Sequence, residues 1–153
     1  MQRNESHERF SCDVSAFRVG VAAARFNATI TAALLRSAEA ELKRHRIKPQ
    51  AITVLRVPGS IEIPLALKLL AETGKYEALL ALGAVIRGET PHFDYVCRIA
   101  SDGVLRVMLD YGVPVGFGIL TTHTEEQARA RFHAGAQAVR AALHMACLKS
   151  RLS

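Results

Sequence analysis

Tryptophan is absent from this 153-residue chain, and cysteines and long apolar runs are scarce. The three cysteines, Cys12, Cys97 and Cys147, are odd in number and widely spaced, which argues against a disulfide framework and predicts buried free thiols. The longest apolar run, Ala78–Ile86, is far shorter than the roughly 20 residues that span a membrane. The N-terminus is polar, whereas a secretory signal peptide has an apolar core. We therefore expect a soluble, cytoplasmic protein with no membrane partner.

Aromatic residues are also few, which matters for whether the positive net charge indicates nucleic-acid binding. The chain carries 20 Lys and Arg against 14 Asp and Glu, a formal charge of +6, so a basic nucleic-acid-binding module is one interpretation. The positive residues are dispersed, however, and three tyrosines and six phenylalanines form no basic–aromatic stripe on which bases could stack. We expect no nucleic-acid partner, and the charge favours anionic ligands in general.

Half of the residues are apolar and 22% are charged, a composition that excludes a disordered or collagen-like chain. A chain of this length is typical of one compact domain with a sizeable core. No repeat, low-complexity tract or internal linker divides it. We predict a flexible N-terminal arm over residues 1–13 and a single domain over residues 14–153.

Two kinds of segment alternate along this domain. Short apolar runs are typical of strands that are covered on both faces, and apolar residues at three- and four-residue steps predict helices. The predicted strands are Phe17–Ala23, Ala51–Val57, Ala78–Val85 and Val113–Leu120. The predicted helices are Ala28–His45, Glu62–Glu72, Pro91–Tyr111 and Glu125–Arg151. This alternation predicts an α/β fold, a flavodoxin-like three-layer αβα sandwich with a central four-stranded parallel sheet.

Ligands of such sheets bind outside the carboxyl ends of the strands, so the strand-to-helix junctions are the candidate site. The third junction contains Gly83 and Gly88 at the glycine spacing of a P-loop, but Glu89 stands where the phosphate-binding lysine belongs. Nucleoside-triphosphate hydrolysis is therefore disfavoured, while a simple phosphate ester fits. Thr90 as N-cap and Pro91 at the first helical position predict a helix start directly behind this turn.

Other junction residues have both a functional and a structural interpretation. His92, in the first turn of the predicted helix, is a general acid–base candidate, because the helix dipole favours the neutral imidazole. Phe26 would either stack on a planar heterocycle or fill the core. Ser60 and Glu62 suit hydrogen bonding to a polyol, although Ser60 also fits an N-cap. Arg131 would either bind a phosphate through two parallel hydrogen bonds or lie solvated on the surface.

The junction segments together closely resemble the lumazine synthase family. The resemblance covers about Phe17 to Arg131 in register. It is carried by ARFN (Ala24–Asn27), VPGSIEIP (Val57–Pro64), ALGAVIRGETPHFDYV (Ala81–Val96), PVGFGILTT (Pro114–Thr122) and TEEQA (Thr124–Ala128). One such motif would be a weak signal, but five in order at the selected junctions are specific.

The resemblance implies a reaction as well as a fold. Family members condense 5-amino-6-(D-ribitylamino)uracil with 3,4-dihydroxy-2-butanone 4-phosphate to 6,7-dimethyl-8-ribityllumazine, releasing phosphate and water, in the penultimate step of riboflavin biosynthesis. No metal or organic cofactor is expected. The implied partners are the two small-molecule substrates and further copies of the chain, in pentamers or assemblies of pentamers. A protein that binds a flavin- or lumazine-like ligand without turnover is the alternative.

The resemblance also implies roles for single residues. His92 is expected to shuttle protons, Phe26 to stack on the pyrimidine, and Phe117 to reach the pocket from a neighbouring subunit, while Asn27 shares the motif of Phe26. The ribityl chain and the ring edge are expected to contact Ser60, Ile61 and Glu62. The expected pyrimidine contacts, largely through backbone, are Ala84, Val85 and Ile86. The expected phosphate contacts are Gly88, Glu89, Thr90 and Arg131. The stretch directly after Arg131, Phe132–Gln137, is shorter than in many family members and contains no lysine.

Overall fold

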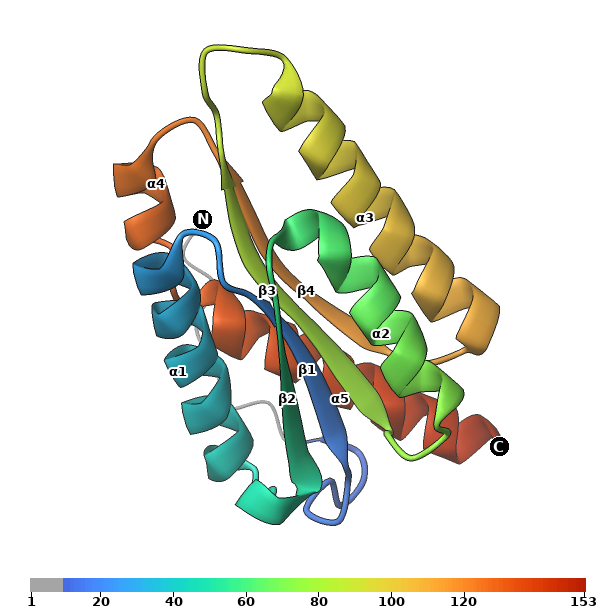
Figure 1. Ribbon diagram of the computed structural model, residues 1–153. Helices are drawn as coiled ribbons and strands as arrows, with labels where there is room; N and C mark the ends of the chain where they lie inside the picture. Colours follow the sequence, from blue (N-terminus) through green and yellow to red (C-terminus); the bar gives the residue numbers. More distant parts are fainter. Residues whose placement is uncertain (1–9) are drawn as a thin grey trace.

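The computed structural model describes residues 10–153 and contains a four-stranded parallel sheet between two layers of helices (Figure 1), which confirms the predicted architecture. The strands lie in the order β2-β1-β3-β4. Their bounds are β1 Val19–Ala24, β2 Ile52–Val57, β3 Ala78–Ile86 and β4 Val115–Thr122. The α-helices are α1 Ala28–Arg44, α2 Ile63–Glu72, α3 His92–Tyr111, α4 Glu125–Arg129 and α5 Ala134–Leu152. Two 3₁₀ turns, Pro49–Ala51 and Ser60–Glu62, precede β2 and α2.

The helices cover both faces of the sheet, as parallel strands require. Helices α1 and α5 lie on one face and α2 and α3 on the other (Figure 1). Successive side chains of a strand point to opposite faces. Accordingly, Leu80 of β3 belongs to the apolar cluster that includes Leu42 and Leu143, whereas its neighbour Leu79 packs with Leu67. The central strands are therefore buried on both sides, and their unbroken apolar sequence follows from this.

The segment predicted as one helix from Glu125 to Arg151 is divided in the structure, so that prediction is wrong. Helix α4 ends at Arg129, and a turn precedes α5. Gly135 lies in the first turn of α5, and a Cβ built there would lie 2.1 Å from the carbonyl oxygen of Leu34 in α1. Helices α1 and α5 therefore approach backbone to backbone at this glycine.

The N-terminal segment is attached to the domain at its described end. Residues 1–9 of the predicted arm lie outside the described residues. Phe10 and Cys12 pack against the cluster beneath α5, and the Phe10 ring lies 4.6 Å from that of His45, measured between centroids. Cys12 and Cys147 form a disulfide with a Cα–Cα distance of 5.6 Å, which overturns the prediction of free thiols for this pair. A sequence separation of 135 residues gives no spacing signal, since only the fold brings the two together.

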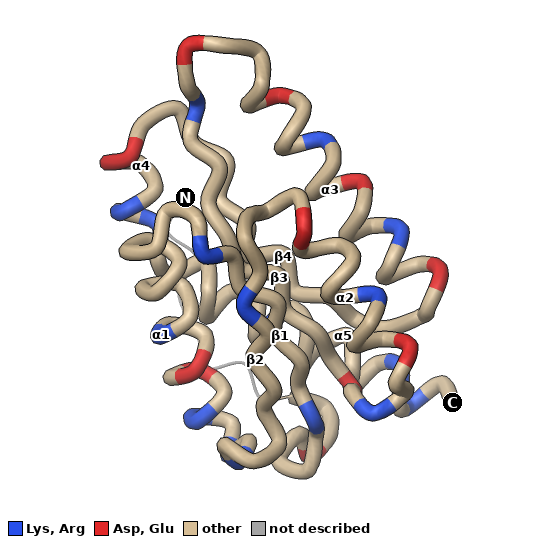
Figure 2. Tube along the Cα trace, in the orientation of Figure 1, with Lys and Arg blue, Asp and Glu red and all other residues tan. Residues whose placement is uncertain are grey.

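Charged residues are spread over the surface. Figure 2 shows Lys and Arg interspersed with Asp and Glu along α3, whereas the charged residues of α5 are all basic. Cys97, the third cysteine, is free, as predicted, but it is half-buried and not fully buried. Burial, with a smaller contribution from Asp94, raises the pKa of its thiol. No helix among residues 10–153 is long and apolar enough to cross a membrane.

Candidate active site

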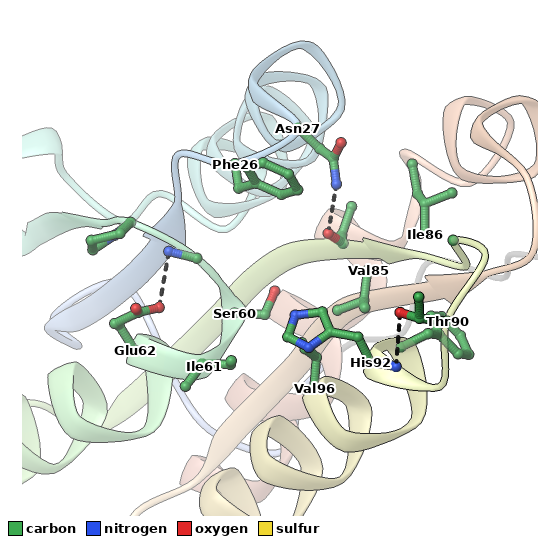
Figure 3. Close-up of a pocket in the computed structure, with 15 residues that line it drawn as sticks. Phe26, Asn27, Ser60, Ile61, Glu62, Val85, Ile86, Thr90, His92 and Val96 are labelled. Atoms are coloured by element: carbon green, nitrogen blue, oxygen red, sulfur yellow. Dashed lines mark hydrogen bonds between the residues drawn. The ribbon is translucent and has the colours of Figure 1, made fainter.

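A cavity of about 410 Å³ opens at the carboxyl end of the sheet, where the first three strand-to-helix junctions meet. Its volume is within the range of small-molecule sites. Figure 3 shows side chains from these junctions around one hollow, with the imidazole of His92 pointing into the space that Ser60 also borders. Eleven of the fourteen predicted site residues line it. They are Phe26, Asn27, Ser60, Ile61, Glu62, Ala84, Val85, Ile86, Gly88, Thr90 and His92.

Asn27 joins the first junction to the third. Its backbone is left-handed, with φ of 57°, a conformation that asparagine tolerates better than most residues. Its side-chain amide donates a hydrogen bond to the carbonyl oxygen of Ala84 at 2.9 Å (Figure 3). The preceding residue, Phe26, donates its backbone N–H to the Pro58 carbonyl at 2.9 Å. Its ring is 72% exposed, so core filling is excluded and a face is available for stacking.

The second junction holds a carboxylate in a fixed position. Glu62 accepts a hydrogen bond from the Gly59 N–H through Oε2 at 3.1 Å, as in a capping box (Figure 3). Ser60 is buried and its hydroxyl lies against β3, where a Cβ built on Gly83 would come within 2.7 Å of Oγ. Gly83 is thus needed for the close approach of the two segments. Ser60 is not an N-cap, because Gly59 precedes the 3₁₀ turn in that role.

The third junction places His92 at the start of α3. The helix begins at His92, and Pro91 is its N-cap, so the predicted start at Pro91 is one residue early. Thr90 still caps this end in part, since its Oγ1 accepts the His92 N–H at 3.4 Å. His92 is exposed and lines the cavity with Phe26 and Glu62. An exposed imidazole at the cavity wall is open to a ligand, whereas one sealed in the core would not be.

The fourth junction is joined to the third through the main chain. Arg87, directly after β3, donates its N–H to the carbonyl oxygen of Thr122, the last residue of β4, at 2.9 Å. Beyond β4, Thr124 caps α4 by accepting the N–H of Gln127 at 3.1 Å. Backbone and amide hydrogen bonds therefore connect all four junctions into one rim.

The described residues contain no group of three or more His, Cys, Asp or Glu that could hold a metal ion. The side chains that line the cavity include an imidazole, a carboxylate, hydroxyls and an aromatic face.

Comparison with known proteins identifies the family. Residues 16–150 match the family described as 6,7-dimethyl-8-ribityllumazine synthase. The chain belongs to this family. It is similar to the 6,7-dimethyl-8-ribityllumazine synthase of Desulfovibrio desulfuricans, with 48% identity over 87% of the chain and 86% of the relative. The enzyme of the same name from Salinibacter ruber is 47% identical over 91% of the chain and 92% of the relative, and that of Protochlamydia amoebophila 45% over 92% and 85%.

Membership of the lumazine synthase family assigns the chain 6,7-dimethyl-8-ribityllumazine synthase activity, a transferase reaction of riboflavin biosynthesis.

Three predicted residues lie outside the cavity of a single chain. Glu89 is exposed in the turn before α3, and Phe117 on β4 is 46% exposed. Arg131, just after α4, donates through Nη1 to the Gln127 carbonyl at 2.8 Å.

Four lining residues were not predicted, namely Pro58, Gly59, Phe93 and Val96. Pro58 and Gly59 open the second junction, and a Pro-Gly pair directly after a strand is the turn signal that could have identified them. Phe93 and Val96 lie on α3 one and four residues after His92, so helical spacing places Val96 on the same face as His92. That spacing would have identified Val96.

Proposed function

We propose that the junction cavity binds both substrates of the synthase reaction side by side and that His92 moves protons between them. The observation that carries this proposal is the convergence of Phe26, Glu62 and His92, from three separate junctions, on one cavity. Holding two reactants together supplies much of the acceleration in a condensation whose nucleophile, an aromatic amine, belongs to a substrate.

The ribitylaminouracil is proposed to occupy the side bordered by the first two junctions. Its pyrimidine ring stacks on Phe26, and the main chain of Ala84, Val85 and Ile86 contacts the ring edge. The ribityl hydroxyls bond to Ser60 and Glu62, with Ile61 beside the ring. The carboxylate suits this role because the Gly59 N–H orients it before the ligand arrives.

The four-carbon phosphate substrate is proposed to lie at the third junction, with its phosphate against the backbone of Gly88, Glu89 and Thr90 and against Arg131. Attack of the amine on the ketone with loss of one water, elimination of phosphate, and ring closure by the second amine with loss of a second water each transfer protons. His92, at the cavity wall between the two subsites, takes and returns these protons. No step requires a nucleophile from the protein.

The test is a mixture of purified protein and both substrates, followed by lumazine absorbance and released phosphate. We expect His92→Ala to lower kcat by about 100-fold, at the low end of general acid–base effects, because substrate positioning survives the change. His144→Gln, a change at an exposed histidine on α5, is the matched control and should leave kcat unaltered. Ligand binding without turnover in the wild type would favour the binding-protein alternative, and unchanged kcat in His92→Ala would remove His92 from its role.

Self-association into pentamers is proposed from the exposed apolar residues. Neighbouring helices α2 and α3 carry exposed leucines and an isoleucine, Leu65, Leu69, Ile99, Leu105 and Leu109, and Leu109 is 70% exposed. An apolar surface of this kind is typical of a subunit interface. The exposed Phe117 ring would then complete the cavity of a neighbouring chain. Light scattering should give at least five times the 16.7 kDa chain mass, and Phe117→Ala should raise the KM for ribitylaminouracil. A cytoplasmic location without nucleic-acid or membrane partners stays a prediction.

A further inference from the structure

The cavity has no basic side chain in its wall apart from His92. None of its lining residues is Lys or Arg, and Glu62 contributes a negative charge. A phosphate monoester carries nearly two negative charges near neutral pH, and its removal from water is unfavourable without a compensating cation. Backbone N–H groups of the turn before α3 supply partial charge only. Glu89, exposed in that same turn, opposes an anion.

Arg87 is a cation at the third junction. It lies between Ile86 and Gly88, both of which line the cavity. Its backbone N–H is held by the Thr122 carbonyl at 2.9 Å. Its guanidinium carbon lies 5.8 Å from the centroid of the Phe93 ring, within cation–π range, and that ring lines the cavity.

Side chains from two junctions lie near the Phe93 ring. The ring of His123, after β4, lies 6.2 Å from it between centroids. A planar guanidinium stacked on an aromatic face is pre-organised, so less side-chain freedom is lost when it bonds an anion. Arg131, by contrast, donates to the carbonyl oxygen of Gln127 in the preceding helix α4 in the single chain. Phe93 therefore fixes one cation beside the turn before α3.

We propose that Arg87 binds the phosphate of the four-carbon substrate and that Phe93 is the positioning residue that holds its guanidinium there. The inference rests on the proposed function for the identity of the ligand. It adds Arg87 and Phe93 to the residues expected from the sequence, and it assigns the cation–π contact a role in phosphate affinity.

The experiment measures phosphate binding separately from turnover. Equilibrium dialysis with labelled inorganic phosphate, at constant ionic strength, gives its Kd for the full chain. Steady-state kinetics give the KM of each substrate. Arg87→Met keeps the length of the side chain and removes its charge, Arg87→Lys keeps the charge without the planar fork, and Phe93→Leu removes the ring face. Arg151→Met, at an exposed site in the last turn of α5, removes the same charge and is the matched control.

We expect Arg87→Met to raise the Kd of phosphate and the KM of the phosphate substrate by about tenfold or more, the loss typical of a charged hydrogen bond. The KM of ribitylaminouracil and kcat should change less than about twofold, and Arg87→Lys should give a smaller loss. Phe93→Leu should weaken phosphate binding in the wild type and have no further effect in Arg87→Met, because the two residues act as one unit. Circular dichroism checks that each variant is folded.

An unaltered Kd in Arg87→Met, or equal increases in both KM values, would overturn the inference, and so would additive effects of Arg87→Met and Phe93→Leu. The two proposals fail separately. A wild type that forms no lumazine refutes the proposed function, even if Arg87→Met loses phosphate binding. An active wild type with an unaffected Arg87→Met refutes only the inference.

Discussion

We expect Gly83→Ala to weaken binding of the ribityl chain, because Gly83 of β3 lies against Ser60. The new methyl group would lie 2.7 Å from the Ser60 hydroxyl oxygen and 3.2 Å from Cδ1 of Ile63. Real Cβ atoms essentially never show a contact below 3.0 Å, so the hydroxyl has to move. Ser60 is only 6% exposed and has little room to do so without leaving its place at the cavity wall.

Gly83→Ala should change both the KM of ribitylaminouracil and the free energy of unfolding. Loss of one neutral hydrogen bond to the ligand is worth about 0.5–1.5 kcal/mol, which raises the KM of ribitylaminouracil by roughly 2- to 12-fold. Overpacking lowers the free energy of unfolding by about 1–3 kcal/mol, whereas replacing a glycine within a strand by alanine raises it by about 0.5–1 kcal/mol. The free energy of unfolding therefore falls by up to about 2.5 kcal/mol, less than the 5–15 kcal/mol typical of a domain, and the variant folds.

Steady-state kinetics on wild type, Gly83→Ala, Ser60→Ala and the double variant test this reasoning. In the Ser60→Ala background the displaced hydroxyl is already gone, so Gly83→Ala should add little to the KM of ribitylaminouracil. The KM of the phosphate substrate should stay constant throughout. The reasoning is refuted if Gly83→Ala leaves the first KM unchanged, or raises it equally with and without the Ser60 hydroxyl.

Three further perturbations have expected outcomes. Gly135→Ala gains about 1 kcal/mol of helix propensity, but its methyl group would lie 2.1 Å from the Leu34 carbonyl oxygen, an overpacking that costs about 1–3 kcal/mol. We therefore expect urea unfolding to show a net loss of up to about 2 kcal/mol, and a stabilised variant would contradict the close approach. Reduction of the Cys12–Cys147 disulfide, or replacement of both cysteines by serine, should lower the free energy of unfolding by about 2–5 kcal/mol. In the Cys97→Ser variant, a reductant should still lower the free energy of unfolding by the same amount. Because burial raises the pKa of the Cys97 thiol, its thiolate fraction at pH 8 is low. Iodoacetamide should therefore label Cys97 more slowly than free cysteine, and the labelling rate should rise as the pH increases beyond the ordinary thiol range. Equal labelling rates for Cys97 and free cysteine would refute this.

Much of the fold could be predicted because parallel strands covered on both faces have unbroken apolar sequences. The third strand, predicted to end at Val85, ends at Ile86, and the helix after the first junction starts at Ala28 as predicted. The break between α4 and α5 was missed because helical residues fill the sequence on both sides of it. The signal was Gly135, which is needed where α5 crosses α1, but a glycine within helical sequence does not state which neighbour it meets.

The sequence predicted which strand-to-helix junctions form the candidate site, but it did not predict all of the side-chain contacts there. Strand order brings the junctions together, so residues such as Phe26 and His92 share one cavity for topological reasons. The amide bond from Asn27 to β3 depends on a left-handed backbone that the sequence motif alone does not reveal. The orientation of Arg131 likewise depends on the turn after α4, which the sequence did not predict.

The disulfide between Cys12 and Cys147 makes a covalent ring of nearly the whole described chain, with only short tails outside it. All four junctions lie within this ring. A protease that cuts one exposed junction loop therefore opens the ring without releasing a fragment. The severed halves of the rim stay joined through the two sulfurs, and they separate on a denaturing gel only after reduction.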